Sequence, residues 1–439
     1  MNAPAGMIFP GDEGYPGKGM NFSNKALFAP RLGLVYDPRG NGKEVIRAAY
    51  GIFYDLPPFS YYVRVSSTAP YGGQLTLTNP PLPNPWQNFA GGNPFPVTLK
   101  SDVKFPENAV YYTQPPHLMN TYVQQWNLSV QKQLGNDWAL SLTYLGNKTT
   151  HLWFENQANP ATYSPGNCTV AGRTSACSTT GNLDQRRELY LTNPDQGKYY
   201  SSIVQTDGGG NANYNGGLVS IQKRFSNRFS ILGNYTLSHC INDGDGDQFL
   251  DGVDFQDPRN RRGDRASCGS DRRHNINTSA VMSSPKFKSA ALDQLAGGWQ
   301  LSTIFRVQSG APLTATTGRD AALVGGTQRP MLVGDPELSN PALTKWFNTD
   351  AFIANGPGQY GNAGRNILLG NKTVNFDIGL TRRFQVSERQ RMEFRAEAFN
   401  VLNLMRPGNP NTSLNSSLFG QVTSALDPRI MQFALKYVF

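Results

Sequence analysis

The residues best suited to chemistry form an acidic stretch near the middle of the chain. Positions 1, 3, 5, 9 and 12 of this stretch are Asp243, Asp245, Asp247, Asp251 and Asp254. This EF-hand-like spacing can surround a hard cation with carboxylate oxygens. The stretch departs from the usual loop because Gln248 replaces the glycine of the turn and Asp254 replaces a bidentate glutamate. The sequence therefore predicts a calcium site or, alternatively, a solvated acidic loop.

The cysteines offer a second kind of chemistry. Cys168 and Cys177 form one local pair, Cys240 and Cys268 form another, and all lie in stretches rich in Gly, Asn, Ser and Asp. In an oxidising compartment each pair would close a loop with a disulfide bond. The alternatives are free thiols, or a zinc site formed by His239, Cys240, Cys268 and His274. These zinc ligands lack the compact C-x-x-C spacing of zinc sites.

No catalytic constellation accompanies these residues. The histidines are dispersed at His117, His151, His239 and His274. The chain has no nucleophile elbow, phosphate-binding loop or metalloprotease helix. Its formal net charge of +9 is scattered singly, without a basic helix or a nucleic-acid-binding fingerprint. We therefore predict neither an enzyme nor a nucleic-acid-binding protein.

Segments of alternating apolar and polar residues must position these groups. There are eleven, at residues 28–36, 45–54, 122–134, 138–145, 217–225, 229–238, 274–282, 299–309, 374–384, 391–398 and 431–439. Most are near the roughly 9–11 residues with which a tilted strand crosses a bilayer. Mean hydropathy is -0.45. No apolar run approaches the roughly 18 residues of a membrane helix, but barrel strands alternate and average out.

The connections between these segments alternate between short and long. Short ones cover residues 37–44, 135–137, 226–228 and 385–390, and 283–298 is intermediate. Long ones cover residues 55–121, 146–216, 239–273, 310–373 and 399–427. Outer-membrane barrels have short periplasmic turns and long extracellular loops. A β-sandwich or propeller has no reason to keep every long loop at one end.

Aromatic residues gather at the strand ends beside the short turns. They are Tyr36, Trp138, Phe225, Phe229, Trp299, Phe384 and Phe439. Amphipathic rings favour the level of the lipid headgroups, so this arrangement is typical of an interfacial girdle. Core aromatics at strand ends are the alternative, but a core would not explain why these residues choose the short-turn end.

The last strand indicates the same environment. Met431, Phe433, Leu435, Tyr437 and Phe439 fall on one face, and mostly polar residues fall on the other. A soluble chain seldom ends on such a strand, because chain ends usually fray into solvent. Phe433, Leu435, Tyr437 and Phe439 resemble the insertion signal of outer-membrane proteins, which implies the barrel-assembly machinery as a partner.

Strand counting gives an orientation. If Phe439 ends in the periplasm, the first of eleven strands also runs inward, and residues 1–27 are the tail of an extracellular loop. Eleven strands leave the first and last parallel, whereas single-chain bacterial barrels have even strand numbers. No apolar signal-peptide region opens the chain. We therefore expect residues 28–439 to be the C-terminal half of a larger barrel.

Several segments resemble the Oar-like barrel of TonB-dependent receptors. They are APRLGLVYDP at 29–38, IRAAYGIFYD at 46–55, QWNLSVQ at 125–131, DRRHN at 271–275, GWQL at 298–301 and EFRAEAFNVLN at 393–403. The resemblance covers nearly the whole chain outside the loops. It implies a bacterial outer-membrane barrel of about 22 strands with a plugged lumen. It also implies substrate uptake when TonB pulls on an N-terminal plug, which these residues do not contain.

Function would then lie in the extracellular loops. The loop aromatics Tyr61, Tyr62, Trp86, Tyr111, Tyr112, Tyr199 and Tyr200 would stack on a sugar or peptide, or pack within the loops. A basic group would meet lipopolysaccharide phosphates or pair with nearby aspartates; it comprises Arg259, Arg261, Arg262, Arg265, Arg272 and Arg273. Arg262, Gly263 and Asp264 also spell an adhesion tripeptide, a match common by chance.

The sequence therefore predicts an outer-membrane barrel for TonB-dependent uptake of an unidentified substrate. The first alternative is a cell-surface adhesion or structural barrel without import. A further alternative is a secreted soluble β-protein, which detergent-free recovery in the soluble fraction would favour.

Overall fold

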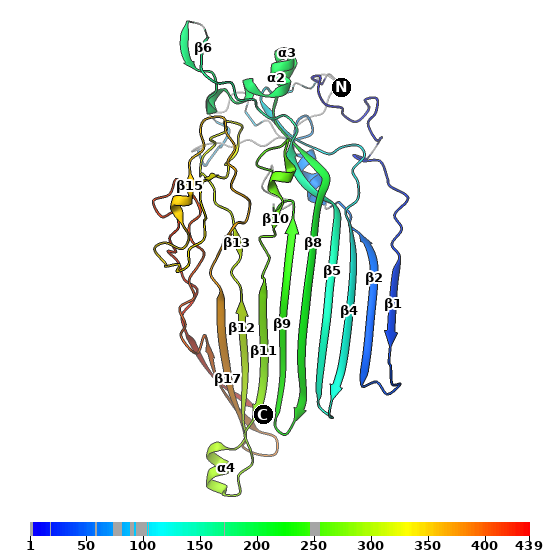
Figure 1. The fold of residues 1–439 in the computed structure, drawn as a ribbon, viewed down its shortest axis with the longest axis vertical. Helices are drawn as coiled ribbons and strands as arrows, with labels where there is room; N and C mark the ends of the chain where they lie inside the picture. The colour runs from blue at the N-terminus through cyan, green and yellow to red at the C-terminus, as the bar shows by residue number, and fades with distance from the viewer. Residues whose placement is uncertain are drawn as a thin grey trace.

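One antiparallel sheet organises the chain (Figure 1). The computed structural model describes residues 3–17, 19–57, 59–72, 81–87, 92–93, 103, 105–170, 172–245 and 255–439. The strand order along the sheet is β1-β2-β4-β5-β8-β9-β11-β12-β17-β18-β19. Each of these strands therefore pairs with the one that precedes it in the sequence. The predicted all-β architecture is confirmed.

Each predicted segment forms one strand of this sheet. The strands are β1 (Arg31–Tyr36), β2 (Glu44–Tyr54), β4 (Tyr122–Leu134), β5 (Trp138–Gln157), β8 (Tyr200–Ser226), β9 (Phe229–Asn242), β11 (His274–Ser283), β12 (Trp299–Gln308), β17 (Thr373–Gln385), β18 (Arg391–Phe399) and β19 (Ile430–Val438). Within the described residues, neither β1 nor β19 pairs along its outer edge, so the sheet is open.

Smaller elements fill the connections. The helices are α1 (Phe59–Ser66), α2 (Glu188–Thr192), α3 (Pro194–Gly197) and α4 (Ala290–Ala296), with 3-10 turns at Thr180–Asn182, Asp184–Arg186, Arg261–Asp264 and Thr349–Ala351. The short strands are β3 (Ala109–Thr113), β6 (Asn167–Val170), β7 (Arg173–Ala176), β10 (Ala266–Ser267), β13 (Pro312–Leu313), β14 (Met331–Leu332), β15 (Phe352–Ile353) and β16 (Leu368–Leu369). None of the helices in the described ranges is long and apolar enough to span a membrane.

Cross-strand partners form rows of one chemical character. One row comprises Tyr36, Ile46, Val130, Leu142, Val219, Tyr235, Ile276, Val307 and Val374. From β4 onward, the adjacent row comprises Gln131, Ser141, Ser220, Asn234, Asn277, Arg306 and Asn375, and its β2 member is the apolar Val45. Directly opposed residues of antiparallel strands share a face, and adjacent residues take opposite faces. The sheet therefore has one apolar face and one polar face.

The two ends of the sheet differ as the connection lengths predict. The connections at 37–43, 135–137, 227–228 and 386–390, together with the α4 connection at 284–298, lie at the lower end in Figure 1. We call this the short-turn end. The long connections lie at the opposite, long-loop end.

Two strands extend further than the alternation predicts. β5 continues to Gln157 and β8 already begins at Tyr200, and the two remain paired up to Gln157 opposite Val204. The predicted connection at 146–216 therefore shrinks to 158–199. The register shifts near His151, whose φ is 58°. Above this irregularity Trp153 and Phe154 are buried against loop residues, so the simple two-face alternation no longer applies.

The aromatics beside the short turns lie at the short-turn end of the sheet. The indole Nε1 of Trp299 donates a 2.9 Å hydrogen bond to the Leu295 carbonyl at the end of α4. The Arg382 guanidinium lies 5.3 Å from the Trp299 ring centroid and 4.6 Å from that of Phe384. This cluster places a cation and a ring NH beside apolar rings, the mixture that an interface between lipid and water favours.

Candidate functional site

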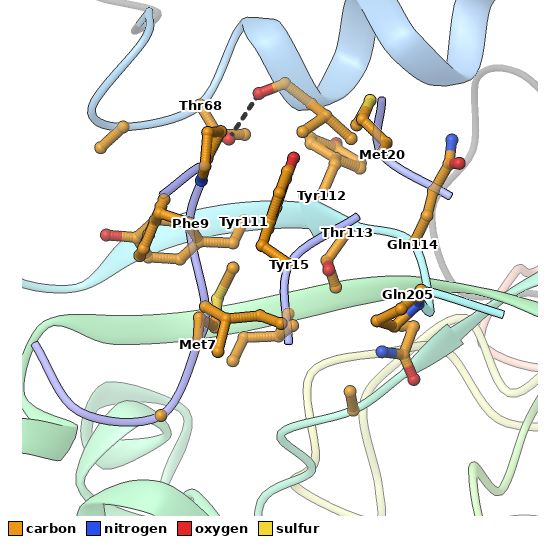
Figure 2. A pocket seen from close by; sticks show the side chains of 18 of the residues that line it. Met7, Phe9, Tyr15, Met20, Thr68, Tyr111, Tyr112, Thr113, Gln114 and Gln205 are labelled. Atoms are coloured by element: carbon orange, nitrogen blue, oxygen red, sulfur yellow. Dashed lines mark hydrogen bonds between the residues drawn. The ribbon is translucent and has the colours of Figure 1, made fainter. Parts of the chain in front are cut away.

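A cavity of about 320 Å³ lies at the long-loop end (Figure 2). Its wall is formed by the N-terminal segment, by α1 with the residues after it, and by β3 with β8. Ligand pockets commonly have volumes of about 300–1,000 Å³. Among the described lining residues the only ionisable side chains are Tyr15, Tyr71, Tyr111 and Tyr112.

Strand β3 positions the centre of this wall. It runs parallel to the upper part of β8, with Tyr111 opposite Ile203, Tyr112 opposite Val204 and Thr113 opposite Gln205. A parallel pair cannot be joined by a tight hairpin, and here residues 114–199, which include β4 and β5, separate β3 from β8. Tyr111 and Tyr200 then pack together, with ring centroids 5.3 Å apart.

Several polar groups of the wall have no partner. Within the described part of the chain, the hydroxyls of Tyr71 and Tyr111 and both amide atoms of Gln114 are buried without a hydrogen bond. Such a group costs about 1–3 kcal/mol, so native proteins retain few of them. Burial, followed by the proximity of Tyr200, raises the pKa of Tyr111. The Tyr111 hydroxyl therefore stays protonated and is able to donate.

The other predicted loop aromatics have different places. Tyr200 donates a 2.7 Å hydrogen bond to the Pro4 carbonyl, and burial raises its pKa to about 12. The Lys198 ammonium lies 5.3 Å from the Tyr199 ring centroid. Tyr62 and Trp86 are half-buried outside the cavity wall, and the side chain of Tyr61 lies outside the described part. The structure therefore brings Tyr111 and Tyr112 together at the cavity, and Tyr200 packs behind them.

Sequence reasoning misses most of the cavity wall. Phe9, Tyr15, Tyr71, Gln114 and Gln205 line the cavity but come from segments far apart in the chain. None of them lies in a recognisable motif. The aromatic content of the N-terminal segment is a weak signal, because a loop tail accounts for it equally well.

The structure describes only the first part of the acidic stretch. Asp243 accepts a 2.7 Å hydrogen bond from the Arg265 guanidinium and a 2.8 Å hydrogen bond from the backbone N–H of Asn211. Asp245 pairs with Arg365. Asp247, Asp251 and Asp254 lie outside the described residues. Within the described residues no three His, Cys, Asp or Glu side chains come together as metal ligands. Calcium binding stays a prediction.

The cysteines form two disulfide bonds, Cys168–Cys177 and Cys240–Cys268. All four cysteines lie in the described part, and none is free there. No thiolate is therefore left for the zinc alternative. His239 Nδ1 lies 3.0 Å from Asp271 Oδ2, and His274 Nδ1 lies 2.9 Å from the Tyr235 hydroxyl.

Replacing both Cys240 and Cys268 with serine will cost about 3.5 kcal/mol of loop stability, from the loop-closure entropy of a 28-residue separation. The same change at Cys168 and Cys177, which are 9 residues apart, will cost about 1 kcal/mol less. Rates of protease cleavage of the folded protein under non-reducing conditions measure both effects. Equal cleavage of the two double variants would contradict the expectation.

Within the described residues, three of the six arginines of the basic group form ion pairs. Arg259 pairs with Glu188, Arg261 with Asp207 and Arg265 with Asp243. Arg272 donates to the Asp271 carbonyl at 2.8 Å. Pairing with aspartates, the alternative to lipopolysaccharide binding, thus describes Arg261 and Arg265, whereas the partner of Arg259 is a glutamate.

The tripeptide at 262–264 is not displayed for adhesion. Asp264 is 1% exposed and pairs with Arg329. Burial raises the pKa of Asp264, and the neighbouring Arg329 opposes that rise. A partner protein has no access to this carboxylate, so the tripeptide functions within the loop packing.

Comparisons with known proteins agree with this architecture. Residues 1–432 match the family model described as outer membrane beta barrel domain. The outer membrane transporter YddB from Escherichia coli has a similar fold, with a TM-score of 0.50 and 10% sequence identity over 93% of this chain and 40% of that chain. The siderophore receptor PirA from Acinetobacter baumannii gives a TM-score of 0.43 and 12% identity over 93% and 40%.

No curated protein sequence matches the chain. The chain spans 40% of the length of the two solved structures named above. The family match extends from the N-terminal loop segment into β19, and so covers both the sheet and the loops. This chain belongs to the outer membrane beta barrel domain family, and its sheet lies in the outer membrane of a bacterium.

Proposed function

We propose that the chain supplies part of the wall and the extracellular loops of a transporter that imports a substrate in a TonB-dependent manner. The observation that carries this proposal is the sheet itself. Eleven consecutive antiparallel strands present one apolar and one polar face, in a fold similar to that of an outer membrane transporter. A polar inner face suits a lumen through which a hydrophilic substrate passes.

The open edges support a larger barrel. In the part of the chain that the structure describes, β1 and β19 have no partner along their outer edges. Unpaired backbone groups are not tolerated in lipid, so the wall must close through further strands. We propose that these strands belong to the same transporter and that a plug fills the lumen. TonB would act on this plug and not on the sheet.

The last strand would guide assembly. Phe433, Leu435, Tyr437 and Phe439 lie on one face of the C-terminal segment and are at least half exposed. An exposed apolar stripe of this kind is suited to recognition by the barrel-assembly machinery and then to contact with lipid. Lipopolysaccharide would surround the long-loop end, and we assign it no particular residue. The proposal contains no catalytic step.

A comparison of spent growth media tests the proposal even while the substrate is unidentified. In the source bacterium, we expect deletion of the gene that encodes this chain to leave one or a few compounds unconsumed. Deletion of tonB should leave the same compounds behind, together with others. Mass spectrometry of the medium measures the residual compounds, and a strain with the gene restored is the control.

The adhesion alternative predicts a different outcome. If deletion changes attachment to surfaces but leaves nutrient depletion equal to that of the wild type, the barrel is structural or adhesive. A compound that requires this gene but not TonB would contradict the TonB-dependent mechanism.

A further inference from the structure

We propose that the loop cavity binds an uncharged ligand that joins an apolar, ring-sized body to an amide group, as in one hydrophobic residue of a short peptide with its peptide bond. This inference rests on the proposed function, because it names the class of substrate that the loops would receive. Four features of the cavity support this inference: a described wall without charged side chains, an unpaired amide, an aromatic side and a small volume.

The charge of the cavity wall excludes ionised ligands. Among the described lining residues there is no Lys, Arg, His, Asp or Glu. An ionised ligand would lose its hydration shell on entry and would gain no counter-ion in return. A free amino acid, a sugar acid or a charged metal chelate therefore fits poorly.

One side of the cavity is polar and has an unsatisfied amide. Figure 2 shows Thr113, Gln114 and Gln205 together on this side. Gln114 is 8% exposed, and neither its carbonyl oxygen nor its amide nitrogen has a hydrogen-bond partner within the described chain. A side-chain amide offers an acceptor next to donors. The complementary group is another amide, which pairs with both atoms once the Gln114 side chain turns its buried amide toward the ligand.

The opposite side is apolar and aromatic. Met7 and Phe9 lie there, away from Gln114 (Figure 2). The Phe9 ring centroid is 6.4 Å from that of Tyr71, at a tilt of 52°. The hydroxyls of Tyr71 and Tyr111 are the other unpaired polar atoms that border the cavity, among the residues described. A sugar carries hydroxyls on every side and would leave several without partners against this wall, whereas a ring or branched side chain fills it.

The volume limits the ligand to one bulky residue. The cavity measures about 320 Å³, and liquid water takes about 30 Å³ per molecule, so it holds roughly ten waters or a larger number of covalently bonded heavy atoms, which pack more closely. N-acetyl-phenylalaninamide is close to this size. It is uncharged and has one ring and two amides, which makes it a suitable probe.

Calorimetric titration of the complete transporter that contains this chain, folded in detergent, tests the proposal with this probe and with N-acetyl-phenylalaninate, its carboxylate analogue. We expect saturable binding of the amide and at least tenfold weaker binding of the carboxylate. Gln114→Leu should weaken amide binding about tenfold, the loss of roughly one well-placed hydrogen bond. Tyr111→Phe should weaken it severalfold. Gln294→Leu, at an exposed position on α4 at the opposite end, is the matched control and should leave binding unchanged.

A second readout separates a binding role from a structural one. In the ligand-free protein, Gln114→Leu removes an unpaired amide from a buried site and should raise the melting temperature. A glutamine that only supports the fold would lower the melting temperature when replaced.

The proposal is overturned by no amide binding, by equal binding of the two probes, or by unchanged binding in Gln114→Leu. These results are independent of import. Binding without any TonB-dependent depletion would refute the proposed transport and leave the ligand class intact. TonB-dependent depletion without probe binding would refute the ligand class and leave the proposed transport intact.

Discussion

Replacing Leu142 with arginine will destabilise the folded sheet in lipid by about 2–4 kcal/mol. Leu142 is 49% exposed in the isolated chain and lies between Val130 and Val219 in the apolar row. It follows the girdle residue Trp138 by four positions along β5, and so lies near mid-depth in a span of about ten residues. An arginine at that depth must leave water or distort the bilayer.

Ser141→Arg is the matched control. Ser141 lies next to Leu142 but pairs with Gln131 and Ser220 on the polar face, so the same arginine should change stability by no more than about 0.5 kcal/mol. Urea titration of each variant of the complete barrel that contains this chain, folded into phospholipid vesicles, measures the difference. Equal effects at the two positions would mean that both faces contact water, as in a soluble β-protein.

Replacing Arg329 with methionine will loosen the long-loop end by about 3–5 kcal/mol at neutral pH. Asp264 is 1% exposed, and its ion pair with Arg329 joins the connection before β11 to the connection after β12. The variant leaves a buried carboxylate without its counter-ion. The double variant Asp264→Asn with Arg329→Met should recover most of the loss, because no charge then remains buried.

The pH dependence of the Arg329 variant follows from the raised pKa of Asp264. Burial is the largest cause of that rise, and Arg329 opposes it, so loss of the guanidinium raises the pKa further. A carboxyl whose pKa is higher in the folded than in the unfolded state favours folding below the unfolded pKa. This contribution is lost as pH rises through the folded pKa. Acid should therefore restore the loops of Arg329→Met.

Protease cleavage of the loops at mildly acidic and neutral pH, followed by mass spectrometry, measures this effect. We expect the difference between Arg329→Met and the wild type to shrink as the pH falls. Equal cleavage of the variant and the wild type at neutral pH would show that the ion pair does not hold the two connections together.

The strands can be predicted because their signal is local. β4 begins and ends at the predicted residues, Tyr122 and Leu134, and Trp126, Leu128 and Val130 alternate with polar residues through its middle. The prediction is too short for β5, because Trp153 and Phe154 face loop residues and not lipid. Apolar and polar residues alternate where one face of a strand contacts lipid and the other contacts the polar lumen. The alternation ends where the strand packs against loop residues instead.

The candidate site can be predicted only in fragments. Tyr111 and Tyr112 are recognisable as loop aromatics, but Gln114 carries no signal, because an amide becomes significant only when burial removes its water. The disulfide pairs follow from spacing, whereas the role of Asp264 does not. Its partner Arg329 is 65 residues away, and the sequence suggests an exposed tripeptide instead.

The sequence by itself determined the eleven long strands, the face that most of their residues take and the end at which the long loops lie. These properties repeat every two residues or depend on connection lengths, so local sequence patterns are enough to predict them. Only the tertiary structure decided where β3 joins β8, which charges are buried and where the cavity forms. These features depend on contacts between segments that are far apart in the sequence. Bringing such segments together costs loop-closure entropy, and the burial that offsets this cost is not visible in any local sequence pattern.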